Sequence, residues 1–365
     1  MILKEGRAAI PASEISLLYE EGKVDDNDLY ANQISFIQDL LTTIVIPLAI
    51  PLLLFSLNIR RWFKYAASGF LSMALALISV VVIVFLAYFI FKDKIPDSGK
   101  VAGMLVGIYT GGTPNVAAIK TALGVDSELF IMTHTSDLVI GAITIIFFIT
   151  LGPKVFSLVL PKFKYKRNGN ASKELISEAE SMEDYSLILK GKRPMLNILK
   201  ALGLAILVFG ISGGISLLFP SSMLMMIVIL GITTFGIAVS LIPAVNRMQG
   251  TFQIGMYLIL IFSLVVSSMA DLTKMISSEY LTVTLMVAFV VFGSLILHLI
   301  LAAIFKISVD DFLITTTALV YSPPFVPVVA GALKNKEVII TGLTVGIIGY
   351  AIGNYIGIFI GHLLG

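Results

Sequence analysis

The sequence predicts an all-α protein that crosses a membrane several times. Only 13% of its 365 residues are charged, whereas 57% are hydrophobic. No ordinary soluble domain is so poor in charge, so the chain belongs to the class of polytopic membrane proteins. Two of its apolar stretches are interrupted by Gly and Pro, and these interruptions predict broken helices inside the membrane.

Eight stretches are apolar and long enough to be full spans. The first 35 residues are polar and acidic, lack the apolar core of a signal peptide, and are expected outside the cytoplasm. We divide the rest into a first membrane repeat at 36–151, a cytoplasmic linker at 152–197 and a second membrane repeat at 198–365. The eight expected spans are 36–57, 65–91, 129–151, 198–219, 222–245, 252–270, 280–305 and 338–364.

The two interrupted stretches, 101–124 and 312–333, are expected to form the core of the protein. The first contains Gly111-Gly112-Thr113-Pro114-Asn115, and the second contains Ser322-Pro323-Pro324-Phe325-Val326-Pro327. Backbone groups freed by such breaks are tolerated at membrane depth only where protein covers them or where they line a wet cavity. Paired breaks in corresponding places of two halves are the sequence feature that points to a transporter's binding site.

The two interrupted stretches also predict an internal repeat. Thr113-Pro114-Asn115-Val116 falls on Pro323-Pro324-Phe325-Val326 when the residue numbers are shifted by 210, and the flanking spans align as well. Identity between the halves is weak, so the argument rests on the hydropathy pattern. The spans at 198–219 and 222–245 have no counterpart in the first repeat. We therefore infer that the chain lacks a first pair of helices, and that a symmetric ancestor would have ten spans.

Charge asymmetry indicates the sense of the repeat. Basic residues gather at Arg60-Arg61 with Lys64, and ten more lie within 152–200. Both clusters share the cytoplasmic side only if the interrupted stretches are re-entrant, dipping in and returning. Lys92, Lys94 and Lys100 are the exceptions, because this arrangement places them outside. This arrangement makes the two repeats inverted with respect to the membrane.

Asp137 is the strongest candidate for a functional side chain. A carboxylate inside an apolar span costs about 2.5–3.5 kcal/mol on insertion scales and usually faces a cavity, where it holds a cation or a proton. The alternative is a structural hydrogen bond to a neighbouring helix. His134, one turn earlier on the same expected helix face, is either a proton relay or a histidine satisfied by Thr133 or a backbone carbonyl.

Neutral oxygen atoms around the breaks suit sodium, which prefers hard oxygen ligands. Thr113, Asn115 and Asp137 are the candidate sodium ligands, with Thr135 and Ser136 as further hydroxyl oxygens. In the second half, Asn354 and Tyr350 either complete the site or bond helices together. The candidate solute- and ion-binding residues are Gly112, Thr113, Pro114, Asn115, His134, Thr135, Ser136, Asp137, Ser322, Pro323, Pro324, Tyr350 and Asn354.

Other classes of function find little support. The chain has no cysteine, no His-Glu-x-x-His motif and no phosphate-binding loop, so we expect no enzyme and no cofactor beyond a coupling Na⁺ or H⁺. A net charge of only +2 argues against nucleic acid as a partner. The glycine run Gly342, Gly346, Gly349, Gly353 and Gly357 indicates close helix packing.

The carboxy-terminal segment from Gly342 to Gly357, which contains Gly349-Tyr350-Ala351-Ile352-Gly353-Asn354, resembles the signature of the membrane family known as domain of unknown function 819. Gly111-Gly112-Thr113-Pro114-Asn115-Val116-Ala117-Ala118, followed by Asp137, resembles its first-half signature. The second break reads Ser322-Pro323-Pro324, where many relatives carry a Gly-Gly-Pro-Ala-Thr type of segment. The resemblance implies an architecture similar to sodium–bile-acid and sodium–glutamate symporters, in which a substrate-carrying core moves against a scaffold. Related carriers are often dimers, so a homodimer is the candidate assembly.

We therefore expect a multi-pass protein of a cell membrane, the bacterial inner membrane, whose partners are the lipid bilayer and a small solute. The expected function is secondary active transport, by symport, of an anionic or zwitterionic solute coupled to Na⁺ or H⁺. The alternative is a channel or a membrane sensor built on a carrier scaffold.

Overall fold

The computed structural model describes residues 23–56, 67–164, 192–269 and 277–365, together with residues 15, 18, 19 and 21. All regular structure in these ranges is helical, and eight of the helices are long and apolar enough to cross a membrane, which confirms the predicted fold class. These helices are α2 (Asp26–Phe55), α4 (Ala67–Phe91), α7 (Ser127–Thr150), α11 (Lys192–Ser216), α12 (Leu224–Ser240), α14 (Thr251–Met269), α15 (Ser278–Ile304) and α18 (Glu337–Leu364). Short turns flank them: α8 (Gly152–Phe156), η1 (Ser221–Met223) and α13 (Pro243–Asn246).

Helix α2 begins ten residues before the expected span at 36–57. Asp25 caps it in a reciprocal capping box with Asp28, and the polar first turns continue into the apolar part without interruption. The expected boundary at residue 35 therefore falls inside one continuous helix. Hydrophobic patterning located the apolar part of this helix but not its polar start, because capping residues rather than apolar residues define that end.

The first interrupted stretch forms a hairpin, here called hairpin 1, made of α5 (Ser98–Gly111) and α6 (Thr113–Leu123). The chain reverses at Gly112, whose φ of 74° lies in the region that favours glycine. The two arms lie against each other, since a methyl group on Gly107 of α5 would collide with the Ile119 side chain of α6. The segment therefore folds back on itself and is not one continuous helix.

The second interrupted stretch forms hairpin 2, made of α16 (Val309–Val320), η3 (Pro323–Phe325) and α17 (Val326–Leu333). The reversal occurs at Ser322, with a φ of 77°. Both arms reach the same glycine of α18, because a Cβ on Gly342 would lie 2.9 Å from Ile314 Cγ1 and 2.6 Å from Val326 Cγ1. Hairpin 2 is therefore folded back in the same way as hairpin 1.

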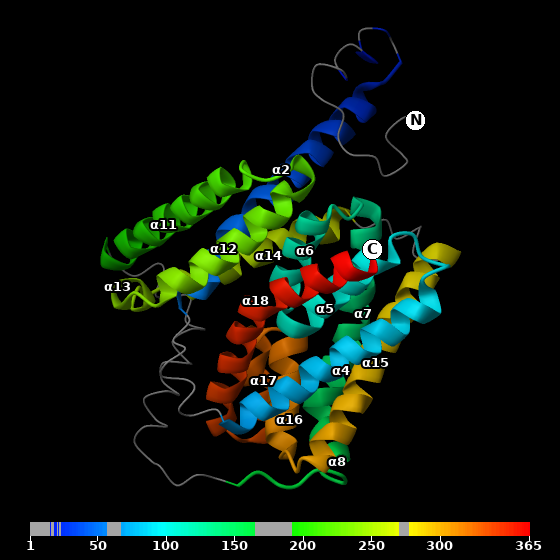
Figure 1. Cartoon of the computed structure of the whole chain (residues 1–365), viewed down its shortest axis with the longest axis vertical. Coiled ribbons are helices and arrows are strands. Elements are labelled where there is room, and N and C mark those ends of the chain that lie inside the picture. Colours follow the sequence, from blue (N-terminus) through cyan, green and yellow to red (C-terminus); the bar gives the residue numbers. More distant parts are fainter. Residues whose placement is uncertain are drawn as a thin grey trace.

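Helix α18 carries both hairpins on its glycine stripe (Figure 1). Hairpin 2 packs against Gly342 and Gly346, in the amino-terminal half of α18, and hairpin 1 packs against Gly349 to Gly361 further along. At the far end, the start of α5 at Gly99 packs against the last two residues of the chain. The two hairpins thus point toward each other from opposite ends of one helix, and glycine permits the close approach on which this depends.

Backbone conformation repeats between the two halves. Gly112 and Ser322 both have positive φ, as do Gly124 and Lys334, and the residue numbers of each pair differ by 210. Helices α6 and α7 begin at Thr113 and Ser127, and their counterparts η3 and α18 begin at residue numbers larger by the same 210. These correspondences support the internal repeat. The inverted sense of that repeat is taken up below as a proposal.

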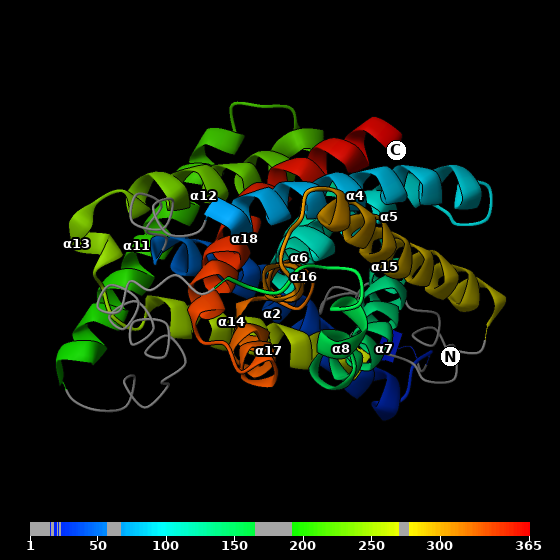
Figure 2. The ribbon, with the colours of Figure 1, turned by 90° about the horizontal axis from the view of Figure 1, so that it is seen from below.

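The remaining helices divide into two groups around the hairpins. Helices α2, α11, α12 and α14 pack against one another, while α4 and α15 pack against each other on the other side of α18 and the hairpins (Figures 1 and 2). Helix α7 packs mainly against α15. Arm α6 of hairpin 1 also packs against α12 and α2, so it links the two groups. The paired helices α11 and α12 belong to the first group, and α12 also packs against α18.

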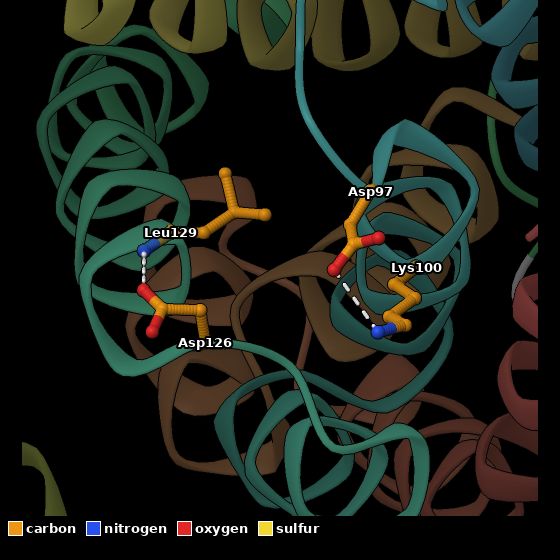
Figure 3. Close-up of polar contacts among 4 residues, drawn as sticks. All are labelled: Asp97, Lys100, Asp126 and Leu129. Carbon is orange, nitrogen blue, oxygen red and sulfur yellow. Dashed lines mark hydrogen bonds and ion pairs between the residues drawn. The ribbon is translucent and has the colours of Figure 1, made fainter. Parts of the chain in front are cut away.

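Charges differ between the two ends of the bundle. Where hairpin 1 enters, Asp97 pairs with Lys100 at 3.0 Å, and nearby Asp126 caps α7 by accepting from the Leu129 amide at 3.3 Å (Figure 3). Where hairpin 2 enters, the amide of Val309 donates to the carbonyl of Pro161 at 3.0 Å, which joins α16 to the segment after α8. The second end carries the basic side chains Lys154, Lys162, Lys164, Lys306, Lys334 and Lys336. Arg60, Arg61 and Lys64 lie outside the described residues.

Candidate functional site

The two breaks meet tip to tip. A methyl group on Gly112 would collide with the hydroxyl of Ser322 and would lie 3.3 Å from its Cβ. Both residues are buried and both have φ near +75°, with ψ near 180°. For a residue with a side chain this conformation is strained, and such strain gathers at ligand sites and switch regions.

The returning arm of each hairpin starts with proline. Pro114 occupies the first turn of α6, and Pro323 and Pro324 occupy the first two positions of η3. Proline is well suited to a helix start because its missing N–H would be unpaired there anyway. The tip of hairpin 2 consequently offers few free amides, which are the groups that normally hold an anion at a helix start.

Asn115 fixes hairpin 1 to α18. Its Nδ2 donates to the carbonyl of Gly349 at 3.0 Å, and its side chain fills the space left by Gly111 and Gly353. The side chain is 1% exposed, and its Oδ1 has no hydrogen-bond partner among the described residues. A buried amide oxygen without a partner is unusual and suits a bound cation or water. Thr113, next to the tip, is half-buried.

Asp137 is linked to hairpin 1 through a tyrosine. The hydroxyl of Tyr109, three residues before Gly112, donates to Asp137 Oδ1 at 2.9 Å. The carboxylate of Asp137 is half-buried, whereas Tyr109 is almost fully buried in α5. A change at Asp137 can therefore reach the tip of hairpin 1 through one hydrogen bond. Among the described residues, no hydrogen bond joins Asp137 directly to either tip.

The other candidates on α7 have different surroundings from Asp137. His134 is 1% exposed and stacks on Phe130, with ring centroids 5.7 Å apart, and neither ring nitrogen has a hydrogen-bond partner among the described residues. The hydroxyl of Ser136 pairs with that of Thr284 on α15 at 2.8 Å. Thr135 is half-buried. The structure therefore does not bring His134 and Asp137 together, although they lie one turn apart.

Tyr350 and Asn354 lie on the side of α18 that faces the first helix group. The Tyr350 hydroxyl lies 3.7 Å from Met256 Sδ of α14, and Asn354 Nδ2 donates to Thr233 Oγ1 of α12 at 3.0 Å. Both residues join helices. Asn354 Oδ1, like Asn115 Oδ1, has no hydrogen-bond partner among the described residues, so both expected roles stay open for Asn354.

A pocket lies between α4, α5, α7, α15 and α16, and we call it the five-helix pocket. Tyr109 and Tyr321, which lie at the breaks, form part of its wall, and so does His298 of α15. The Tyr321 ring packs on Gly141 of α7, which lies one helical turn after Asp137. The polar side chains that line the pocket are Tyr109, Thr144, Ser294, His298, Thr316 and Tyr321.

Of these six residues, only Thr316 stands out in the sequence, as part of Thr315-Thr316-Thr317, a run of hydroxyls that either lines the path or bonds to its own helix backbone. The other five were not among the candidates from the sequence. The signals were weak: Tyr321 directly precedes the second break, Tyr109 lies one turn before the first, and His298 is the lone histidine of a long apolar run. Hydroxyl side chains in membrane helices commonly bond to their own helix, so their sequence gave no reason to group them.

The sequence profile described as "Protein of unknown function (DUF819)" matches residues 25–365. A similar curated protein is the "Uncharacterized membrane protein YjcL" of Bacillus subtilis (strain 168). It is 28% identical over 342 residues, which cover 89% of this chain and 83% of the relative.

Proposed function

The chain belongs to the DUF819 family of membrane proteins, and from its own geometry we propose that it is a secondary active transporter of a small solute. One observation carries this proposal, namely that two re-entrant hairpins enter from opposite ends of α18 and touch at Gly112 and Ser322. Broken helices whose polar backbone ends meet inside a membrane protein are typical of carriers, in which they surround the solute and the coupling ion.

Asp137 is the proposed coupling site. Its carboxylate can take up a proton or balance a sodium ion, and its hydrogen bond with Tyr109 transmits the change to hairpin 1. The free Oδ1 of Asn115 supports a role as a sodium ligand, and Thr113 adds a hydroxyl at the same tip. The proposal needs no cofactor beyond this ion and involves no catalytic chemistry.

The proposed placement in the membrane follows from the charges at the two ends. The basic end, where hairpin 2 enters, is assigned to the cytoplasm, and the end with Asp97 and Asp126 to the outside. Under this assignment the two repeats are inverted in a bacterial inner membrane. From the sequence, the expected solute is anionic or zwitterionic.

Alternating access can be tested without knowing the solute, because the natural chain has no cysteine. Ser294→Cys places one thiol in the five-helix pocket, and within the described part of the chain the Ser294 hydroxyl bonds to its own helix, at the carbonyl of Val291. We expect a membrane-impermeant thiol reagent to modify this thiol from either side of sealed, oriented vesicles. Lys94→Cys and Lys154→Cys, at opposite ends of the bundle, should each react from one side only.

The same preparations separate a carrier from a channel. A carrier reconstituted in planar bilayers should show no unitary currents, whereas a channel should show them. Modification of Ser294→Cys from only one side, under every sodium concentration and pH tested, would contradict the carrier proposal. Unitary currents would establish the channel alternative in its place.

A further inference from the structure

We infer that a single sodium ion binds behind the tip of hairpin 1, where the amide oxygens of Asn115 and Asn354 and the carboxy-terminal end of α5 hold it. We call this place the amide site. Sodium, rather than the proton, thereby becomes the coupling ion of the transporter proposed above. Only this coupling role rests on the proposed function, since the binding of the ion is a property of the site itself.

Two buried amide oxygens mark the amide site. Asn115 and Asn354 are 1% and 0% exposed, and Oδ1 of each has no hydrogen-bond partner among the described residues. Asn115 Nδ2 donates to the Gly349 carbonyl at 3.0 Å, and Asn354 Nδ2 donates to Thr233 Oγ1 at 3.0 Å. These bonds orient both amides, because a carbonyl cannot donate and the Thr233 hydroxyl gives its proton to the Ile229 carbonyl. Two buried acceptor atoms therefore lack a positively polarised partner.

The two side chains meet at one level of α18. Asn115 occupies the space beside Gly353, where an added methyl group would collide with its Nδ2, and Asn354 is the next residue along α18. Helices α6, α12 and α18 each pack against the other two, and they supply Asn115, Thr233 and Asn354 respectively (Figure 1). The two unpartnered oxygens therefore belong to one junction of three helices.

The end of α5 adds further oxygen atoms at this level. Methyl groups on Gly349 and Gly353 would collide with the carbonyl oxygen and the hydroxyl of Thr110, respectively. The last carbonyls of a helix have no partner within it and carry the negative end of its dipole. The Thr110 hydroxyl donates to the Val106 carbonyl at 2.8 Å, so its oxygen can only accept. In carriers, the carboxy-terminal ends of broken helices are where sodium is coordinated.

The chemistry of these atoms selects a small metal cation. Amide, hydroxyl and carbonyl oxygens do not titrate near neutral pH, so the amide site cannot store a proton. An anion would face unpartnered acceptor atoms and the negative end of α5. Hard cations prefer such oxygen ligands, and cavity size decides among them. Neither Gly349 nor Gly353 leaves room for a methyl group, which favours sodium over the larger potassium ion.

Asp137 supplies the balancing charge. The oxygens of the amide site are neutral, so an ion bound there needs a counter-charge within the protein. Tyr109 directly precedes Thr110 in α5 and donates to Asp137 Oδ1 at 2.9 Å. The carboxylate is thereby tied to the helix whose end meets the ion, and its charge strengthens sodium binding without contact.

The test measures the Tm of the purified full-length protein while sodium replaces potassium at fixed ionic strength. Asn354→Leu has a similar shape but no amide oxygen, and about tenfold more sodium should be needed for the same rise. Asn354→Asp places a charge beside the ion, so about tenfold less sodium should suffice. Thr344→Val is the matched control, because it removes a buried hydroxyl of α18 that bonds to its own helix at the Ile340 carbonyl. Its sodium requirement should equal that of the wild type.

Three results would overturn the inference. The first is a wild-type sodium requirement in Asn354→Leu or, if that variant does not fold, in Asn354→Asp. The second is stabilisation by potassium as strong as that by sodium, compared at fixed ionic strength against a large organic cation. The third is a wild-type Tm that does not respond to sodium, which would mean that an ordered water satisfies the two oxygens.

A direct binding measurement keeps the amide site distinct from the transport function. We expect the purified wild type to retain radioactive sodium and Asn354→Leu to lose it. Retained sodium, together with modification of Ser294→Cys from one side only, would keep the amide site and reject the carrier. Modification from both sides without retained sodium would reject the amide site and leave a carrier that is coupled in another way.

Discussion

Gly112 of hairpin 1 lies against the side chain of Ser322 of hairpin 2, and the two residues share a backbone conformation with φ near +75°. Their numbers differ by 210, the same shift that aligns the two halves of the chain. Under the inverted repeat proposed above, a residue that touches its own counterpart lies on the axis that relates the two halves. The contact between Gly112 and Ser322 is therefore the place where substitutions are most informative.

Gly112→Ala should destabilise the protein strongly. The combination of positive φ with ψ near 180° costs a residue with a side chain about 1–3 kcal/mol, and the added methyl group would collide with the Ser322 hydroxyl. Gly124→Ala is the matched control, because Gly124 has a φ of 59° but open space around a Cβ. We expect a clearly lower Tm for Gly112→Ala than for Gly124→Ala. Equal Tm values would show that the tips do not touch as described.

Ser322→Gly should have the opposite effect. Ser322 adopts a conformation that costs a non-glycine residue about 1–3 kcal/mol, and glycine removes that strain while adding about 0.4–1 kcal/mol of chain entropy in the unfolded state. The net expectation is a Tm that is unchanged or raised, measured by thermal unfolding in detergent. A marked fall in Tm would mean that the Ser322 hydroxyl contributes more stability than the backbone strain removes.

Gly349→Ala tests the glycine stripe of α18. A Cβ at this position would collide with the carbonyl oxygen of Thr110 and would lie 3.1 Å from Leu319 Cδ2, so it would push hairpin 1 away. Overpacking of this kind costs about 1–3 kcal/mol. Gly203→Ala in α11 is the control, because nothing lies near a Cβ there and alanine favours the helix. The two variants should shift the Tm in opposite directions, and parallel shifts would contradict the described packing.

The sequence contained enough information for the spans, the two breaks and the role of the glycine stripe. Hydropathy and Gly-Pro interruptions depend on local composition, and glycines spaced along one helix imply close neighbours whatever those neighbours are. The sequence did not predict which residues surround a given side chain. The same 3.6-residue period places His134 and Asp137 on one face, yet their neighbours differ because the packed helices differ. The five-helix pocket was missed for the same reason, since five separate segments contribute its wall.

Asp137→Asn should abolish the response of the protein to the coupling ion. If sodium is the coupling ion, we expect the wild-type Tm to rise when sodium replaces potassium at fixed ionic strength. If the proton is the coupling ion, we expect the wild-type Tm to change with pH at constant sodium and potassium concentrations. Asparagine retains an acceptor for the Tyr109 hydroxyl, so the hydrogen bond at 2.9 Å can persist while the charge is lost. The fold should therefore survive in Asp137→Asn, and only the ion or pH response should disappear.

Two neighbouring substitutions decide whether this effect is specific to Asp137. Ser136→Ala removes a hydroxyl that pairs with Thr284, on a different side of α7, and should preserve the ion response. Tyr109→Phe keeps the carboxylate but breaks its link to hairpin 1. The Tm should therefore still respond to the ion, while the ion should no longer alter the modification rate of Ser294→Cys. If Asp137→Asn responds to sodium and pH as the wild type does, the coupling ion binds elsewhere. The unpartnered Oδ1 of Asn115 would then be the next oxygen to test.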